Sequence, residues 1–435
     1  MRLRVWLSVC FLVAWVGCAS SMRTDVRSAI DASNAGDAMA AYERMRASEG
    51  GDTALLADIA AVVLKAEIVH DTGNRDAAFG QLLSAGTAAN AALESLAHDE
   101  SPLVRAASLE ILASRGQTSA RNDLRAYLND ADPVVRSHAL AALDVVDEAN
   151  VLAEALAHPT SLVRMKAAQR AATSTVVPEL FLALTTVARN DPEVSVRAAA
   201  VRALGRAGPT AIETLRDRLS DPAESVRTAA VGALAMADRA RAREILGSLL
   251  DMGPNAASLE AARVLAMPNG ADESGVVDAR AFLLRGLAAE DVNLRTQSAV
   301  ALAGLREDAT MNDALLQTME SDGDSSVRIL LAGSLLNRAS TEARARTLLH
   351  ALLQTEGATG VQAAALLARD HDRDAMHVLA AATRSPSPVL RRISVRAVAR
   401  DAMLPDLVRR SLLDADVSVR LAAAGAILSA SSASH

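Results

Sequence analysis

One short stretch of the chain carries the side chains best suited to bind a metal ion. Asp370, His371, Asp372 and Asp374 lie within one turn-length segment, and His377 follows. Carboxylate oxygens and imidazole nitrogens ligate divalent cations, so this spacing could form a metal site. The same residues are typical of an exposed turn whose acidic side chains cap the next helix. We favour the turn and predict no metal ion, with these five residues as the candidates if one binds.

The common catalytic motifs are missing from the sequence. It contains no Gly-x-Ser-x-Gly, no Walker loop, no Gly-x-Gly-x-x-Gly, no His-Glu-x-x-His and no Cys-x-x-Cys. The only cysteines are Cys10 and Cys18, so the rest of the chain has no thiol nucleophile and no intramolecular disulfide. We therefore expect a protein that is not an enzyme and that needs no cofactor.

The N-terminal segment has the pattern of an export signal. Arg2 and Arg4 precede an apolar run over residues 5–16, which is too short to span a bilayer comfortably. Residues 1–17 are therefore predicted to be a signal peptide. At its end, Gly17 and Cys18 resemble the bacterial lipoprotein signal, in which the cysteine is lipidated and becomes the mature N-terminus.

The lipoprotein resemblance implies an anchor and an address. Cys18 would carry the lipid, and residues 18–24 would form a tether to the folded part. Ala19 lacks the Asp that retains such lipoproteins in the inner membrane, so the resemblance favours an outer-membrane lipoprotein facing the periplasm. Trp15 departs from the family, which usually has Leu at that position, and ordinary cleavage nearby, for example after Ala19, stays open.

Composition favours helices. The sequence is 51% apolar but only 2% aromatic, with much Ala and Leu, so close approach of helices must provide the buried surface. The basic residues are nearly all Arg, since Lys65 and Lys166 are the only lysines. A net charge of −7 and a pI near 5.7 nevertheless oppose nucleic-acid binding.

A pattern with a period of 28 to 35 residues spans most of the chain in eleven units. Each unit has one position, usually Arg, that serves as a reference for the others. The residue before this reference position is Val or Leu in all eleven units, and the residue three positions after the reference position is Ala or Ser in nine. The residue seven positions after the reference position is large and apolar in nine units. These offsets lie four residues apart, so they form one stripe along a helix. We call this reference position the register position. Its residues in the eleven units are Arg105, Arg136, Arg164, Arg197, Arg227, Glu260, Arg295, Arg328, Gln362, Arg391 and Arg420.

Helix starts precede the register positions. Four residues upstream, seven units carry a residue that caps helices well, and a second amphipathic run lies before the cap. Each unit therefore reads as helix, short turn and helix, with no room for a strand. The predicted caps are Ser101, Asp132, Thr160, Asp291, Asp324, Ser387 and Asp416.

These units resemble the HEAT-repeat family, in the short form also found in phycobilisome lyases. The resemblance covers residues 86–430 and implies an all-α solenoid in which an Asp and an Arg six residues apart form a ladder between neighbouring repeats. Weaker bonding is expected at the units where His158, Pro254, Ala289, Glu356 and Ser385 replace the Asp. The matching pairs are Asp99 with Arg105, Asp130 with Arg136, Asp191 with Arg197, Asp221 with Arg227, Asp322 with Arg328, and Asp414 with Arg420.

The segments outside the repeats are short. Residues 25–85 are predicted to form an N-terminal helical cap on the array, with helices over residues 25–33, 37–48 and 54–70. Residues 431–435 read as a polar tail.

A solenoid exposes the same helix face again and again and binds through that extended surface. We therefore predict an envelope-anchored scaffold that holds a protein partner, touches the membrane only through its lipid and does not bind nucleic acid. The alternative is a HEAT-like lyase or enzyme accessory subunit that acts on a protein partner. A binder of envelope polymers is a third hypothesis, but such sites usually need aromatic platforms, and Trp6 and Trp15 both lie in the predicted signal peptide.

Overall fold

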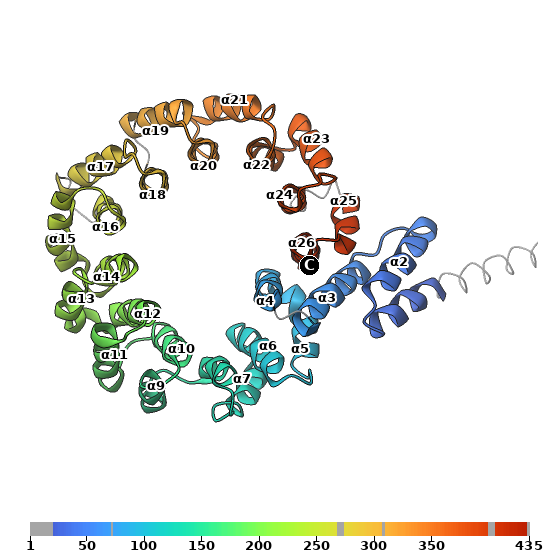
Figure 1. Ribbon diagram of the computed structural model, residues 1–435, viewed down its shortest axis with the longest axis horizontal. Helices are drawn as coiled ribbons and strands as arrows, with labels where there is room; N and C mark the ends of the chain where they lie inside the picture. The colour runs from blue at the N-terminus through green and yellow to red at the C-terminus, as the bar shows by residue number, and fades with distance from the viewer. Residues whose placement is uncertain (1–20, 71–72, 268–273, 307–308, 399–404, 433–435) are drawn as a thin grey trace, which may run out of the picture. The chain divides into compact units, whose positions relative to one another are not determined.

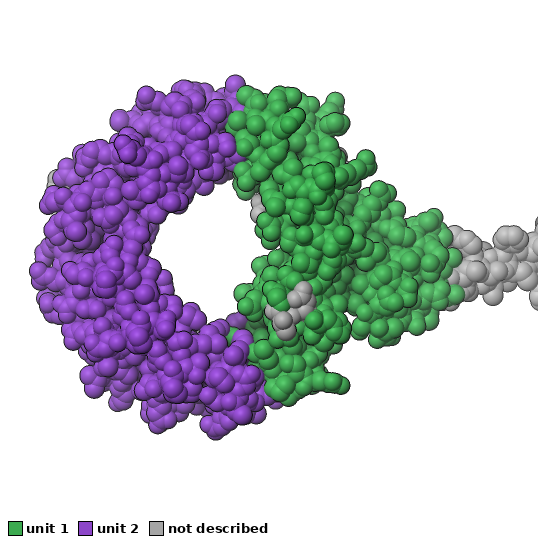
Figure 2. Space-filling view, in the orientation of Figure 1, with its two compact units in different colours: residues 1–112, 350–435 green, residues 113–349 purple. Residues whose placement is uncertain are grey.

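The computed structural model describes residues 21–70, 73–267, 274–306, 309–398 and 405–432 (Figure 1). By their contacts the residues divide into two units, residues 1–112 with 350–435 (unit 1) and residues 113–349 (unit 2), coloured in Figure 2. In the described ranges all regular structure is helical, which confirms the predicted all-α solenoid class. The predicted signal peptide and Cys18 lie outside the described residues.

Unit 2 is a succession of helical hairpins. Its second helices contact one another in order, α8 with α10, α10 with α12, and so on to α20, and each first helix packs on its own second helix (Figure 1). This is the stacking expected of helical repeats, in which each unit contacts its neighbours. The α-helices are α7 (Thr118–Arg125), α8 (Pro133–Ala139), α9 (Ala149–Leu156), α10 (Ser161–Ala171), α11 (Pro178–Asn190), α12 (Val194–Leu204), α13 (Ile212–Arg218), α14 (Glu224–Ala237), α15 (Arg239–Gly247), α16 (Ala256–Ala266), α17 (Ser274–Gly286), α18 (Val292–Ala303), α19 (Ala309–Ser321), α20 (Ser325–Leu335) and α21 (Glu342–Leu352), whose last residues belong to unit 1; the 3₁₀ turns are η2 (Leu140–Ala142), η3 (Gly205–Ala211) and η4 (Ser248–Met252).

Unit 1 joins the two ends of the chain. Helix α26 contacts α24 on one side and the N-terminal helices α3 and α4 on the other. The helices are a first one over residues 21–31, then α2 (Ala35–Glu49), α3 (Thr53–His70), α4 (Arg75–Ser84), α5 (Asn90–Leu96), α6 (Pro102–Ser114), α22 (Ala358–Leu367), α23 (Arg373–Ala382), α24 (Pro388–Val398), α25 (Pro405–Arg410) and α26 (Val417–Ser432); the 3₁₀ turns are η1 (Gly86–Ala89), η5 (Ala368–Asp370) and η6 (Ser411–Leu413).

The structure adds two details at the chain ends. Helix α26 continues to Ser432, so it includes the first two residues of the segment predicted as a polar tail, residues 431–435. The N-terminal helices also do more than cover the first repeat, since α3 contacts both α5 and α26. Gly425 permits part of this packing: a Cβ atom there would lie 3.1 Å from the Cβ of Gln81 on α4.

The stripe predicted from the repeat is a row of buried side chains. The Val or Leu before the register position is at most 5% exposed in nine units, and only Leu294 and Leu390 are more accessible. Burial of each such side chain contributes about 1.5–3 kcal/mol. The small residue three positions later is fully buried in eight of its nine units, for example at Ala200 and Ala230, which lets the next helix approach closely. The hairpins are therefore held by short apolar contacts rather than by large aromatic side chains.

Some of the predicted cap residues bond the first turn of their helix through the side chain, and others do not. The carboxylates of Asp132, Asp291 and Asp324 each accept a backbone N–H from the first turn of their helix. Thr160 occupies the N-cap of α10, but its side chain makes no such bond. Aspartate is therefore the residue that caps these helices most directly.

Two valines on α12 test the buried stripe. Val196 is fully buried and Val194 is 39% exposed, so Val196→Ala is expected to lower the local opening free energy of α12 and α14 by about 1.5–3 kcal/mol. Val194→Ala is expected to change it by less than about 0.5 kcal/mol. Native-state hydrogen exchange measures both values. Equal losses in the two variants would contradict the assignment of the stripe to the interface.

Candidate functional site

The register arginines bind first within their own unit. In eight units the Nη1 atom donates to the carbonyl oxygens of the residues six and five positions earlier. In Arg197, for example, these acceptors are Asp191 and Pro192, at 2.9 and 3.3 Å. The bonds fix the guanidinium plane over the turn between the two helices.

The opposite edge of the same guanidinium reaches the next unit. We call the contact between two neighbouring units a joint. In four joints the Nε and Nη2 atoms of the register arginine donate to both carboxylate oxygens of the aspartate in the turn of the next unit. Each of these aspartates also accepts the backbone N–H two residues further on, so one carboxylate fastens two units and a turn. The four pairs are Arg164 with Asp191, Arg197 with Asp221, Arg295 with Asp322, and Arg391 with Asp414, at donor–acceptor distances of 2.7–3.1 Å.

These pairs are largely shielded from water. In the Arg164–Asp191 pair the side chains are 13% and 3% exposed. Burial alone would raise the pKa of Asp191, but the hydrogen bond from Arg164, the backbone N–H of Glu193 and the charges of Arg164 and Arg197 together lower it. Asp221, Asp322 and Asp414 have lowered pKa values for the same reasons. The carboxylates therefore stay charged and paired over the ordinary pH range.

Other joints lack this pair, at positions where the aspartate is replaced. Arg136 faces His158, whose Nε2 lies 3.0 Å from Nη2. Because the Nδ1 atom of His158 accepts the N–H of Thr160, the neutral ring carries its proton on Nε2, and two donors then face each other. At the next break Arg227 meets a unit that has Pro254 in the aspartate position. These are two of the five joints at which replacement of the aspartate predicts weaker bonding.

Unit 1 continues the ladder with a residue that the repeat does not predict. Arg420, the last register arginine, binds Glu67 of α3 through Nε and Nη2, with Nε 3.1 Å from the carboxylate. Glu67 lies 353 residues away in sequence and is only 9% exposed. No periodicity points to it, because it lies outside the repeats, and only the fold brings the pair together.

A second ionic network joins the same ends. Arg409 of α25 is 3% exposed and binds Glu43 of α2 as well as Asp406, whose carboxylate lies 2.7 Å away. Arg46 of α2 lies 3.6 Å from Asp406. The pKa of Glu43 is lowered because the hydrogen bonds and charges of Arg409 and Arg46 outweigh the effect of burial. Helices α2 and α25 are thus held by alternating charges.

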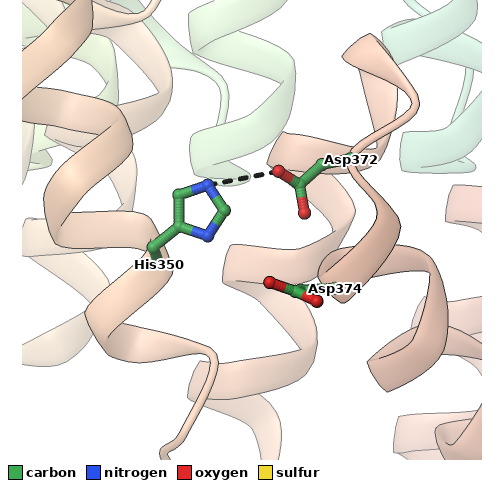
Figure 3. Close-up of side chains that lie close together, drawn as sticks. All are labelled: His350, Asp372 and Asp374. Atoms are coloured by element: carbon green, nitrogen blue, oxygen red, sulfur yellow. Dashed lines mark ion pairs between the residues drawn. The ribbon is translucent and has the colours of Figure 1, made fainter.

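The structure rearranges the candidate metal cluster. Asp372 and Asp374 lie beside His350, which comes from α21, and ligand atoms of the three residues lie within 4.8 Å of one another (Figure 3). Among the described residues, Asp370, His371 and His377 do not belong to this group. Asp372 caps α23 by accepting the N–H of Ala375, and its other oxygen lies 3.1 Å from Nε2 of His350. Asp372 therefore serves as a helix cap beside His350, and the positive end of α23 disfavours a cation.

Unit 2 contains an open groove of about 1130 Å³ lined by residues of α13 to α16 and of the turns between them. Arg227 lies in it, together with Arg216 of α13 and the apolar side chains of Ile245, Leu249 and Met252. Met252 is 72% exposed. The groove coincides with the joint at which the ladder aspartate is missing. Its lining combines charged and apolar side chains.

Comparison with known proteins fits this geometry. Residues 89–172 and 181–266 match the sequence model of the HEAT repeats family. These segments are HEAT repeats. No curated protein matches the chain in sequence.

Solved structures match the chain at low sequence identity and low TM-score. Escherichia coli YibA is 15% identical and covers 66% of this chain and 96% of its own, with a TM-score of 0.32. The CpcE–CpcF complex of phycocyanin lyase from Nostoc sp. PCC7120 is 19% identical over 61% and 94%, with a TM-score of 0.31. The Kap121p mutant is 13% identical over 84% and 52%, also at 0.31. None of these likenesses bears on function.

The ladder predicts a strong and pH-dependent coupling. A double-mutant cycle on Arg164→Gln and Asp191→Asn is expected to give about 1.5–3 kcal/mol at pH 7. The exposed pair Arg189–Asp217, with side chains 42% and 51% exposed, serves as the control and is expected to give less than about 1 kcal/mol. Because the folded pKa of Asp191 is lowered, its contribution is complete above the unfolded pKa near 3.9 and is lost as pH falls through the folded pKa. Equal coupling in both pairs would contradict a structural ladder.

The contact between the chain ends gives another expected outcome. Arg420→Gln leaves the carboxylate of Glu67 without its partner, so hydrogen-exchange protection of α3 and α26 is expected to fall by on the order of 1–3 kcal/mol. Arg396→Gln, at an exposed position of α24, removes the same charge and is expected to leave both helices unchanged. Loss of protection in α26 alone would mean that α3 does not depend on this pair.

Proposed function

We propose that this protein is a non-catalytic scaffold that binds a protein partner along its HEAT repeats and is anchored in the bacterial cell envelope by a lipid on Cys18. The observation that carries the proposal is the groove of unit 2. It offers exposed apolar and charged side chains on a rigid helical frame, as a protein-binding surface requires.

The ionisable groups support a binding role. Catalytic sites tend to gather groups whose pKa values are shifted toward neutrality in a cleft. In the groove, the pKa of Asp221 is instead lowered, and its bond to Arg197 belongs to the ladder. The ionic pairs of unit 1 likewise join helices. Binding without catalysis is therefore the function that these groups fit best.

The envelope address rests on the sequence of residues 1–20. The positive residues, the short apolar run and Gly17 before Cys18 support export and lipidation, and the resemblance to lipoprotein signals favours the outer membrane. A second or third acyl chain would make the attachment stable, since one chain alone binds membranes only marginally. No described helix has both the length and the apolar character that a membrane span requires.

The anchor has a direct test in cells. Globomycin, which blocks lipoprotein signal cleavage, is expected to shift the mobility of the wild-type protein and to leave Cys18→Ala unshifted. The variant is also expected to leave the membrane fraction for the periplasmic fraction. A wild-type protein that shows no shift, or a variant that stays with the membrane, would contradict the lipid anchor. Crosslinking in intact cells followed by mass spectrometry then identifies the protein partner, and repeated capture of none would contradict the scaffold.

A further inference from the structure

The break in the ladder at Arg227 leaves a carboxylate-binding group in place without its carboxylate. The Nη1 atom of Arg227 donates to the carbonyl oxygens of Asp221 and Pro222 at 2.9 and 3.0 Å, as in the intact joints. Its guanidinium plane is therefore fixed in the same way as that of Arg197, which binds Asp221 of the next unit through Nε and Nη2.

The edge formed by Nε and Nη2 of Arg227 has no hydrogen-bond partner among the described residues. Pro254 stands where the next aspartate would lie. The turn before α16 is capped without a ladder carboxylate, because Asn255 accepts the N–H groups of Ala257 and Ser258 and Glu224 accepts that of Ala256. The turn is complete by itself, so the arginine is left open to the groove.

Four other joints of this protein show what such an edge binds. In each of them the two donors hold both oxygens of one carboxylate at 2.7–3.1 Å. A planar guanidinium matches a carboxylate in this bidentate geometry better than it matches a neutral acceptor. The four paired joints therefore indicate that a carboxylate is the ligand that suits Nε and Nη2 of Arg227.

The lining of the groove narrows the kind of ligand. Four acidic residues lie in the lining. Asp217 and Asp221 are bound by Arg189 and Arg197, and Glu213 and Glu244 are the two that repel a polyanion such as a nucleic acid. Ile245, Leu249 and Met252 add apolar surface beside the charged groups. A single carboxylate that is flanked by apolar or basic side chains complements this lining.

We propose that the groove of unit 2 binds an extended segment of a partner protein through one Asp or Glu side chain, held by Nε and Nη2 of Arg227 as the aspartates of the ladder are held by their arginines. The apolar residues beside that carboxylate pack on Leu249 and Met252. This inference rests on the proposed scaffold function and names one of its binding sites.

The test uses the immobilised protein and two synthetic libraries of acetylated, amidated nonapeptides with a fixed central Asp or a fixed central Asn. Mass spectrometry of the retained peptides is expected to show about tenfold or greater preference for Asp, the effect of one charge-assisted bidentate bond. Arg227→Gln is expected to abolish the preference. Arg202→Gln, at an exposed position of α12 outside the groove lining, removes the same charge and is expected to retain it.

A second variant keeps the test decisive if Arg227→Gln unfolds the joint. Arg227→Lys retains the charge but not the planar pair of donors, so the preference is expected to fall several-fold while the circular dichroism stays unchanged. A preference for Asp that persists undiminished in both variants, or none in the wild-type protein, overturns the proposal.

The possible outcomes distinguish failure of the proposed carboxylate site from failure of the proposed scaffold function. Peptides retained without any preference for Asp, or a partner crosslinked equally well to wild-type and Arg227→Gln protein, would overturn the carboxylate site and leave the scaffold function standing. Failure to crosslink any partner bears on the scaffold function itself.

Discussion

The arginine at the register position connects three parts of the chain at once. One edge of its guanidinium is bound to the carbonyl oxygens of its own turn, and the other edge holds the carboxylate of the next turn. Because that carboxylate also bonds a backbone N–H, the spacing of neighbouring hairpins is set by polar contacts with defined directions. The apolar stripe supplies most of the stabilising burial, but burial is not directional, so the ladder adds a directional constraint on the register at the four joints that have it.

The groove of unit 2 lies at a joint that lacks the arginine–aspartate pair. Where the next unit offers Pro254 in place of an aspartate, the arginine keeps its own carbonyl bonds and its other edge reaches the groove. At His158 a side chain still fills the position, and its Nε2 atom lies 3.0 Å from Nη2 of Arg136. A binding surface can thus arise in a repeat protein by loss of one internal contact, without any new element.

Contacts between the chain ends follow the same chemistry. At Arg420, in the last unit of the pattern, Glu67 of an N-terminal helix takes the place that the next unit's aspartate has at the four paired joints. The network around Arg409 adds a second set of pairs between α25 and α2. Terminal repeats of a solenoid normally need polar caps to cover their open ends. In unit 1 the two ends cover each other, so the N-terminal helices act as the cap for the last repeat as well as for the first.

Local regularities were readable from the sequence because each depends on residues a few positions apart. The helical class, the hairpins, the buried Val or Leu column and the joints without a ladder aspartate all follow from the four-residue offsets and from the replacement of single residues such as Pro254. Contacts between distant residues were not readable. Glu67 with Arg420, Glu43 with Arg409, and His350 with Asp372 lack a common period, since each pair is brought together only by the path of the whole chain. The groove beside Arg227 is of the same kind, because its lining is the sum of four helices and the turns between them, and only the tertiary structure decided that the unpaired arginine would lie in it.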